Sequence, residues 1–74
     1  MAKDETGIHE NITPEEAVRM AMERERRAGE FYGSCAATVN DPGVKQLFLF
    51  LEAEERHHFE LLEREHDRFV TPEN

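Results

Sequence analysis

A glutamate and a histidine three residues apart, Glu55 and His58, are the side chains of this protein best suited to chemistry. They lie in the stretch LEAEERHHFELL, residues 51–62. On a helix, residues three apart share a face, so the carboxylate and the imidazole point the same way. Metal ions take carboxylate oxygens and neutral imidazole nitrogens as ligands. An inward-facing Glu-x-x-His is the ligand pair of di-iron and di-manganese helical bundles, so the spacing predicts a metal site.

Two interpretations of this pair remain open at the level of the sequence. Charged residues make up 35% of the chain, so the pair also fits an ordinary solvated helix surface. The metal-site interpretation depends on the apolar neighbours along the same face, because burying an unpaired charge among them is costly and a metal ion removes that cost. These neighbours are Phe48, Leu51, Leu62 and Phe69.

Length and composition exclude several classes of protein. The 74 residues suffice for one small domain, and chains this short often depend on a metal or a partner. The net charge of −8 argues against nucleic acid, which binds basic surfaces. A single cysteine, Cys35, excludes an intramolecular disulfide and a multi-cysteine zinc site. No segment approaches the ~18 apolar residues of a membrane span, so we expect a cytoplasmic protein without membrane contact.

The first helix has a clear beginning and a clear inward face. Thr13, followed by Pro14 and Glu16, forms a capping-box signal, and we expect the helix to continue to about Val39. Its inward stripe, spaced by three and four residues, contains one charged residue, Glu25. The stripe consists of Val18, Ala21, Glu25, Ala28, Tyr32, Cys35 and Val39.

The only strong break in the helical pattern is the tetrapeptide NDPG at residues 40–43. We expect Asn40 to end the first helix in a left-handed conformation and Asp41 to cap a second helix, from Pro42 to about Phe69. So short a connection makes the helices antiparallel neighbours. The predicted organisation is all-α, with a flexible arm at residues 1–12, a two-helix hairpin at 13–70 and a tail at 71–74.

Distances along this hairpin bring Glu25 level with Glu55 and His58. At 1.5 Å per residue, Glu25 lies roughly 22 Å from the turn and Glu55 roughly 21 Å. The one charged residue of the first stripe therefore meets the Glu-x-x-His of the second helix, and these three residues are the predicted metal ligands.

Two further Glu-x-x-His pairs compete with this choice. Glu63 and His66 lie much farther from the turn than Glu25 does. Glu54 and His57 lie at the right height but are rotated by about 100° around the helix. We favour Glu55 and His58, because apolar residues lie on both sides of this pair along the same helix face. We place Glu54 and His57 at the edge of that face, within reach of a subunit contact.

The second helix is too apolar for one partner helix. Five consecutive apolar residues, Leu47–Leu51, cover more than one of its faces. Either another copy of the chain buries them, or they form an exposed patch of the kind that marks an interaction site, and we expect a homo-oligomer. A ferritin-like di-metal site takes a Glu from each of two helices and a Glu-x-x-His from each of two others, and this chain holds half of that set. A two-fold homodimer would bury the apolar residues and complete the ligand set, so we expect a four-helix bundle around two metal ions.

Two other residues of the first stripe have simpler interpretations. Tyr32 falls near the level of Phe48 and Leu51, and we interpret it as a core aromatic residue. A hydrogen bond from Tyr32 to a ligand carboxylate is the alternative that would make it part of the site. Cys35 is interpreted as a small buried residue.

The combination of these residues resembles the ferritin-like superfamily, and within it the encapsulated ferritins and the rubrerythrin-like proteins. The shared features are Glu25, Tyr32 seven residues later, the Asp41-Pro42 turn, and the Glu-x-x-His whose glutamate, Glu55, follows Glu25 by thirty residues. The resemblance covers about residues 17–66.

This resemblance implies a ferroxidase, an oxidoreductase that converts Fe(II) to Fe(III) with oxygen and stores the product. It implies iron ligands at Glu25, Glu55 and His58, with Tyr32 in the catalytic site and two iron ions per dimer, manganese or zinc being alternatives. It also implies larger ring-like oligomers, and an encapsulin nanocompartment as the partner that encloses them in the cytoplasm.

Two alternative functions stay open. Rubrerythrin-like relatives imply peroxide reduction at the same di-iron site, although the sequence has no Cys-x-x-Cys module for a self-contained electron path. A non-catalytic helical interaction module would instead use the acidic surface and Leu47–Leu51 to bind a partner protein, and the Glu-x-x-His would be incidental.

Overall fold

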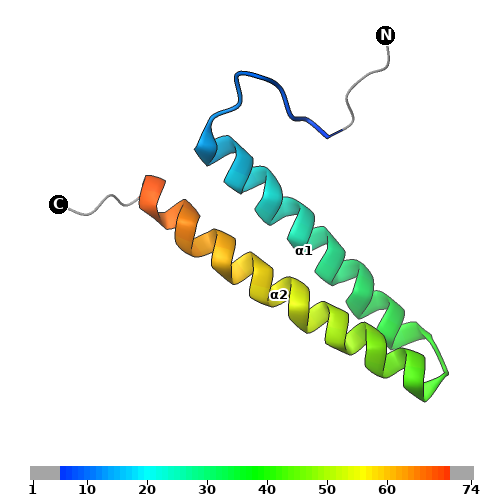
Figure 1. The fold of residues 1–74 in the computed structure, drawn as a ribbon. Coiled ribbons are helices and arrows are strands. Elements are labelled where there is room, and N and C mark those ends of the chain that lie inside the picture. The colour runs from blue at the N-terminus through cyan, green and yellow to red at the C-terminus, as the bar shows by residue number, and fades with distance from the viewer. Residues whose placement is uncertain (1–5, 71–74) are drawn as a thin grey trace, which may run out of the picture.

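Two antiparallel helices make up most of the described part of the chain, as the sequence predicts (Figure 1). The computed structural model describes residues 6–70, in which α1 spans Pro14–Thr38 and α2 spans Pro42–Val70. No strand is present in this part of the chain. Both helices end within one residue of the predicted positions. The predicted tail at 71–74 and the first five residues of the predicted arm lie outside the described residues.

The predicted capping box is formed at the start of α1. The hydroxyl of Thr13 accepts a hydrogen bond from the amide of Glu16 (3.1 Å), and the Glu16 carboxylate accepts one from the amide of Thr13 (3.2 Å). These bonds satisfy amide groups that the first turn of a helix leaves without partners. The Thr13 hydroxyl also donates to the Glu16 carboxylate (3.0 Å), and this bond, together with the one from the Thr13 amide, holds the pKa of the Glu16 carboxyl below its usual range.

The turn between the helices differs from the expectation in one respect. Val39, in an extended conformation (φ −70°, ψ 145°), ends α1, and no described non-glycine residue has a positive φ, so Asn40 is not left-handed. An extended exit suffices because the reversal needs only three residues. Asp41 caps α2 as expected, since its Oδ1 accepts the amide of Val44 (2.8 Å). Lys45 joins the helices beside the turn by donating to the carbonyl of Ala36 (2.6 Å).

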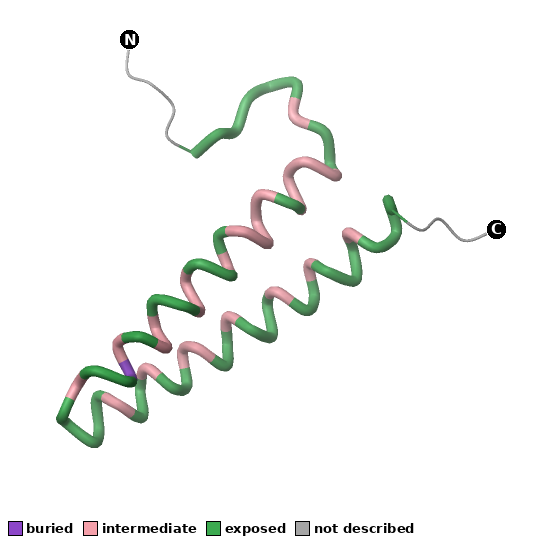
Figure 2. Tube along the Cα trace, turned by 180° about the vertical axis from the view of Figure 1, so that it is seen from behind, coloured by how far each residue is buried: buried purple, intermediate pink, exposed green. Residues whose placement is uncertain are grey.

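The hairpin is a single layer with almost no interior. Its extents are 47 × 44 × 12 Å, and 12 Å is the thickness of one helix with its side chains. Among the described residues only Ala36 is buried, at 2% exposure, and Figure 2 shows half-buried positions along both helices and in the segment before α1. Cys35 is half-buried, so the expected buried cysteine is only partly covered.

Large apolar side chains remain exposed on α2. Leu47, Phe50 and Leu61 point within about 60° of one another around the helix axis, and we call them the α2 apolar stripe. These three and Phe31 of α1 are between 47% and 62% exposed. A patch of this kind on a chain with so small a core is typical of a surface that another molecule covers.

Residues 6–12 precede α1 and contact it. The guanidinium of Arg24 donates to the carbonyl of Thr6 (2.7 Å), and the amide of Ile12 donates to the carbonyl of His9 (3.1 Å). Whether residues 1–12 move as a flexible arm stays a prediction. Neither helix is long and apolar enough to cross a membrane within the described range.

A glycine in α1 gives a test of how closely the helices pack. A methyl group on Gly29 would lie 3.7 Å from Cβ of Glu55, an ordinary contact. Gly29→Ala should therefore raise the free energy of unfolding by up to about 1 kcal/mol, because alanine is the better helix former. At Gly33 the same methyl would lie 2.5 Å from Oε2 of Glu52, so that carboxylate must move and the gain should be smaller. Urea unfolding followed by circular dichroism measures both, and a loss of stability in Gly29→Ala would contradict the spacing.

Candidate metal centre

The three predicted ligands meet across the two helices. α1 carries Glu25, and α2 carries Glu55 and His58 one turn apart. Nδ1 of His58 lies 3.1 Å from Oε2 of Glu25 and 3.7 Å from Oε2 of Glu55. One ligand atom from each residue lies within 4.8 Å of the other two, and no other group of three or more such residues occurs in the described chain. The structure therefore brings together the residues that the sequence selected by their height and by the apolar residues on the same helix face.

The site is shielded on the carboxylate side and open on the histidine side. The side chain of Glu55 is 18% exposed and that of Glu25 is 27% exposed, whereas His58 is 46% exposed. The open side continues into the α2 apolar stripe, since His58 points within about 20° of Leu47 around the helix. A molecule that covers the stripe would also cover the histidine.

The pKa values of Glu55 and His58 are both raised, which indicates a surplus of negative charge at the site. A hydrogen bond with Glu25 raises the pKa of the Glu55 carboxyl, and partial burial adds to this effect. Two carboxyl groups can share a hydrogen bond only if one of them carries a proton. The hydrogen bond to Glu25 likewise raises the pKa of His58 and favours its charged form. Both groups take up positive charge, which a bound cation would supply instead.

The donor set fits a divalent transition metal. Two carboxylates and an imidazole suit iron, manganese and zinc, and they do not distinguish between them. Ligand atoms on one ion lie at most about 4.2 Å apart at bond lengths of about 2.1 Å. The donor atoms here are within 4.8 Å of one another, so small side-chain rotations bring them to binding distance.

Tyr32, which the sequence also offers as a site residue, is not among the groups that meet at the metal centre. Tyr32 packs its ring on Phe48 (centroids 6.1 Å apart) and on Phe31 (5.7 Å), as a core aromatic residue does. Its hydroxyl has no hydrogen-bond partner among the described residues, so the alternative, a hydrogen bond from Tyr32 to a ligand carboxylate, is not formed.

The two competing Glu-x-x-His pairs also lie apart from the group formed by Glu25, Glu55 and His58. Glu54 and His57 are exposed and form no hydrogen bond or ion pair with the described chain. Nε2 of His66 lies 2.9 Å from Oε2 of Glu15, at the open end of the hairpin. That contact was not foreseen, although the same height argument would have placed Glu15 roughly level with His66.

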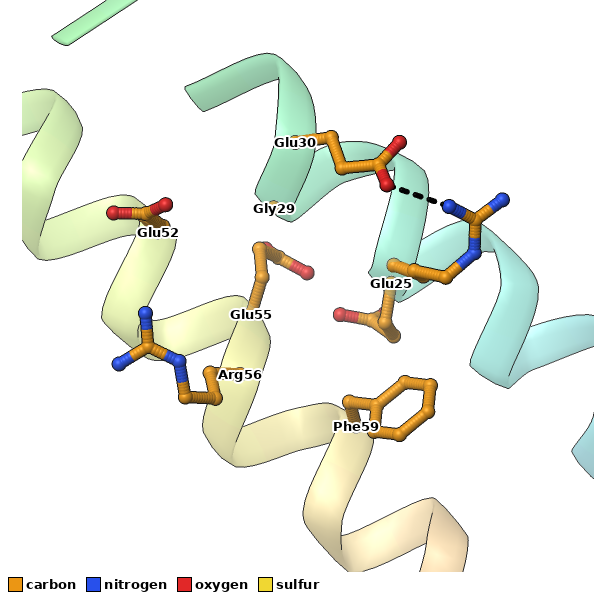
Figure 3. Close-up of a pocket in the computed structure, with 8 residues that line it drawn as sticks. Glu25, Gly29, Glu30, Glu52, Glu55, Arg56 and Phe59 are labelled. Atoms are coloured by element: carbon orange, nitrogen blue, oxygen red, sulfur yellow. Dashed lines mark hydrogen bonds and ion pairs between the residues drawn. The ribbon is translucent and has the colours of Figure 1, made fainter. Parts of the chain in front are cut away.

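A cavity of about 260 Å³ reaches the two carboxylates between the helices (Figure 3). In Figure 3 the carboxylates of Glu25 and Glu55 point toward each other, with the ring of Phe59 beside them. His58 does not line this cavity. Its remaining walls are formed by Arg26, Gly29, Glu30, Glu52 and Arg56. Sequence reasoning missed these residues, although Glu52, Arg56 and Phe59 follow one another at the four- and three-residue spacing of a helix face.

Ion pairs surround Arg26 at the rim of this cavity. Its guanidinium binds Glu23 at 2.5 Å and Glu30 at 2.6 Å. The hydrogen bond from Arg26 lowers the pKa of the Glu23 carboxyl to about 2. All three side chains are well exposed, so water and salt weaken these pairs and they mainly fix the position of Arg26.

Comparisons of the chain with protein-family models, with curated proteins and with solved structures found no match. Function is therefore inferred from the geometry of Glu25, Glu55 and His58 and from the surfaces around them.

Proposed function

We propose that this protein is a ferroxidase that oxidises Fe(II) to Fe(III), with dioxygen as the electron acceptor, at a site shared between two copies of the chain. The observation that carries the proposal is the meeting of a carboxylate of α1 with a Glu-x-x-His of α2. Glu25 lies within hydrogen-bond distance of His58 although 33 residues separate them. Storage of the product and enclosure in an encapsulin shell belong to the same proposal and rest on the family resemblance.

The second copy follows from the incomplete ligand set. One chain offers two carboxylates and one imidazole, whereas a ferritin-like pair of metal positions takes four carboxylates and two imidazoles. A two-fold axis beside His58 would double the set and bury the α2 apolar stripe in a four-helix bundle. The same operation would also supply the core that a single 12 Å layer lacks.

The side chains have distinct tasks in this proposal. Glu55, the most shielded of the three, would bridge the two Fe(II) ions, with Glu25 and His58 as terminal ligands. A bridge formed by Glu25 is the alternative. The raised pKa values of Glu55 and His58 favour their protonated forms, and a metal ligand must be deprotonated, so Fe(II) binding should release protons wherever those forms are populated. Iron supplies the redox chemistry, and the protein fixes two substrate ions side by side and neutralises their charge.

A single substitution separates this chemistry from folding. Glu55→Gln keeps the size of the side chain but removes its charge. The raised pKa means that Glu55 ionises less readily in the folded chain than in the unfolded chain, so metal-free stability falls as pH rises from about 4 through the raised pKa. At neutral pH the metal-free variant should therefore melt higher than the wild type, yet it should bind no Fe(II).

The test combines a metal titration with oxygen consumption. Anaerobic Fe(II) should bind the wild type at one ion per chain and raise its melting temperature, because the ion binds only the folded state. Air should then oxidise it, and Glu55→Gln should neither bind nor oxidise iron. A wild type that binds no Fe(II) would overturn the proposal and favour the interaction module. Turnover with peroxide but not with oxygen would favour the rubrerythrin-like alternative.

A further inference from the structure

The proposed function assigns no role to the cavity beside Glu25 and Glu55. It opens on a different side of α2 from the apolar stripe. Glu52 and Arg56 point about 140° and 180° away from Leu47 around the helix axis. A second copy that covers the stripe and His58 therefore leaves this cavity open to solvent.

The cavity has the size of a hydrated ion. Six water molecules at about 30 Å³ each occupy about 180 Å³, and the cavity holds about 260 Å³. Glu25 and Glu55 form part of its wall, and Gly29 adds no side chain to narrow it. An ion in this cavity would therefore lie directly against the proposed bridging carboxylate.

Two charged side chains of the cavity wall, Glu52 and Arg56, form no hydrogen bond or ion pair with the described residues. Glu30 is held by Arg26 at 2.6 Å. Glu52, in contrast, is half-buried with its carboxylate against Gly33, and it forms no hydrogen bond or ion pair with the described residues. Arg56, one turn further along α2, has no such partner in that range either. Glu52 therefore attracts a cation in the cavity, and Arg56 repels it.

We propose that this cavity is the route by which divalent cations enter the metal centre, and that Glu52 and Arg56 set the rate of entry. The inference rests on the proposed function, because it assumes that Glu25, Glu55 and His58 bind the cation. Glu52 lies three residues from Glu55, roughly 4.5 Å along the helix, within the Debye length of about 8 Å at physiological salt. Neither residue is a ligand, so the two alter the association rate and leave the number of bound ions unchanged.

Stopped-flow binding of Co(II) in the absence of oxygen tests the route without any turnover. The absorbance of ligated Co(II) gives the association rate constant and the number of ions per chain. Glu52→Gln should lower the association rate about three- to ten-fold, and Arg56→Gln should raise it by a similar factor. Both effects should shrink as salt is added, and both variants should still bind one Co(II) per chain.

Matched controls remove the same charges elsewhere on α2. Glu63→Gln lies roughly 12 Å along the helix from Glu55, beyond the Debye length, and Arg64→Gln lies one residue further. Both should bind Co(II) at the wild-type rate. If Glu52→Gln and Glu63→Gln have equal rates while the wild type binds Co(II) normally, the route is wrong and the metal centre stands. If the wild type binds no Co(II), the proposed function fails, and the route fails with it.

Discussion

Replacing His58 by alanine should weaken Fe(II) binding by at least about 100-fold, whereas the same change at His57, beside the proposed subunit contact, should weaken binding far less. The two histidines are neighbours on α2 and both are exposed. Only His58 lies within hydrogen-bond distance of Glu25, at 3.1 Å. Loss of a group that merely orients a metal ligand costs 10- to 100-fold in affinity, so loss of the ligand itself should cost at least as much.

Isothermal titration with Fe(II) under nitrogen measures both variants of this pair. The comparison controls for the loss of an imidazole, for net charge and for position along the helix, because one residue separates the two sites. Equal affinities would show that His58 is not a ligand. A loss confined to His57→Ala would move the centre to Glu54 and His57, the pair rotated by about 100°.

Leu47→Glu should weaken self-association about 100-fold, or about 2.7 kcal/mol, and should lower the number of iron ions bound per chain with it. Leu47 belongs to the α2 apolar stripe and points in nearly the same direction as His58. In a two-fold dimer the new glutamate would appear twice in the interface, and each copy would lose its water without gaining a cationic partner.

The matched control for this substitution is Leu49→Glu. Leu49 is also exposed, at 40%, but it points about 200° away from Leu47 around α2. Its variant should associate as the wild type does. Sedimentation velocity across a micromolar concentration series distinguishes the two. A wild type that stays monomeric would remove the shared site, and equal behaviour of the two variants would place the contact elsewhere.

Metal binding and association are linked in this arrangement. A dimer brings the two carboxylates of each chain toward those of its partner, so in the absence of cations the like charges oppose association. In the proposed dimer, Fe(II) would balance these charges and therefore favour association, and by reciprocity association would favour Fe(II) binding. His58→Ala tests the ligand and Leu47→Glu tests the interface, so together they separate the two contributions.

The sequence by itself determined the hairpin and the height of the site. The capping box at Thr13 and the Asp41 cap use backbone groups within a few residues, so local sequence suffices to place both helix starts. Helical rise is constant at 1.5 Å per residue, and this places Glu25 opposite Glu55 once the turn is known. Membership of the ferritin-like superfamily stays a prediction, because the comparisons found no match. Iron binding and the dimer stay predictions, because they depend on molecules that a single chain does not contain.

Only the tertiary structure decided which side of α2 faces α1. A rotation of about 100° would have selected Glu54 and His57 at the same height, and the choice follows from packing along the whole length of both helices. The same packing produced three further features. These are the cavity lined by Glu52 and Arg56 between the helices, the contact of His66 with Glu15, and the exposure of the α2 apolar stripe. Periodicity indicates which residues share a face of one helix, but the direction of that face depends on contacts between residues that are far apart in the chain.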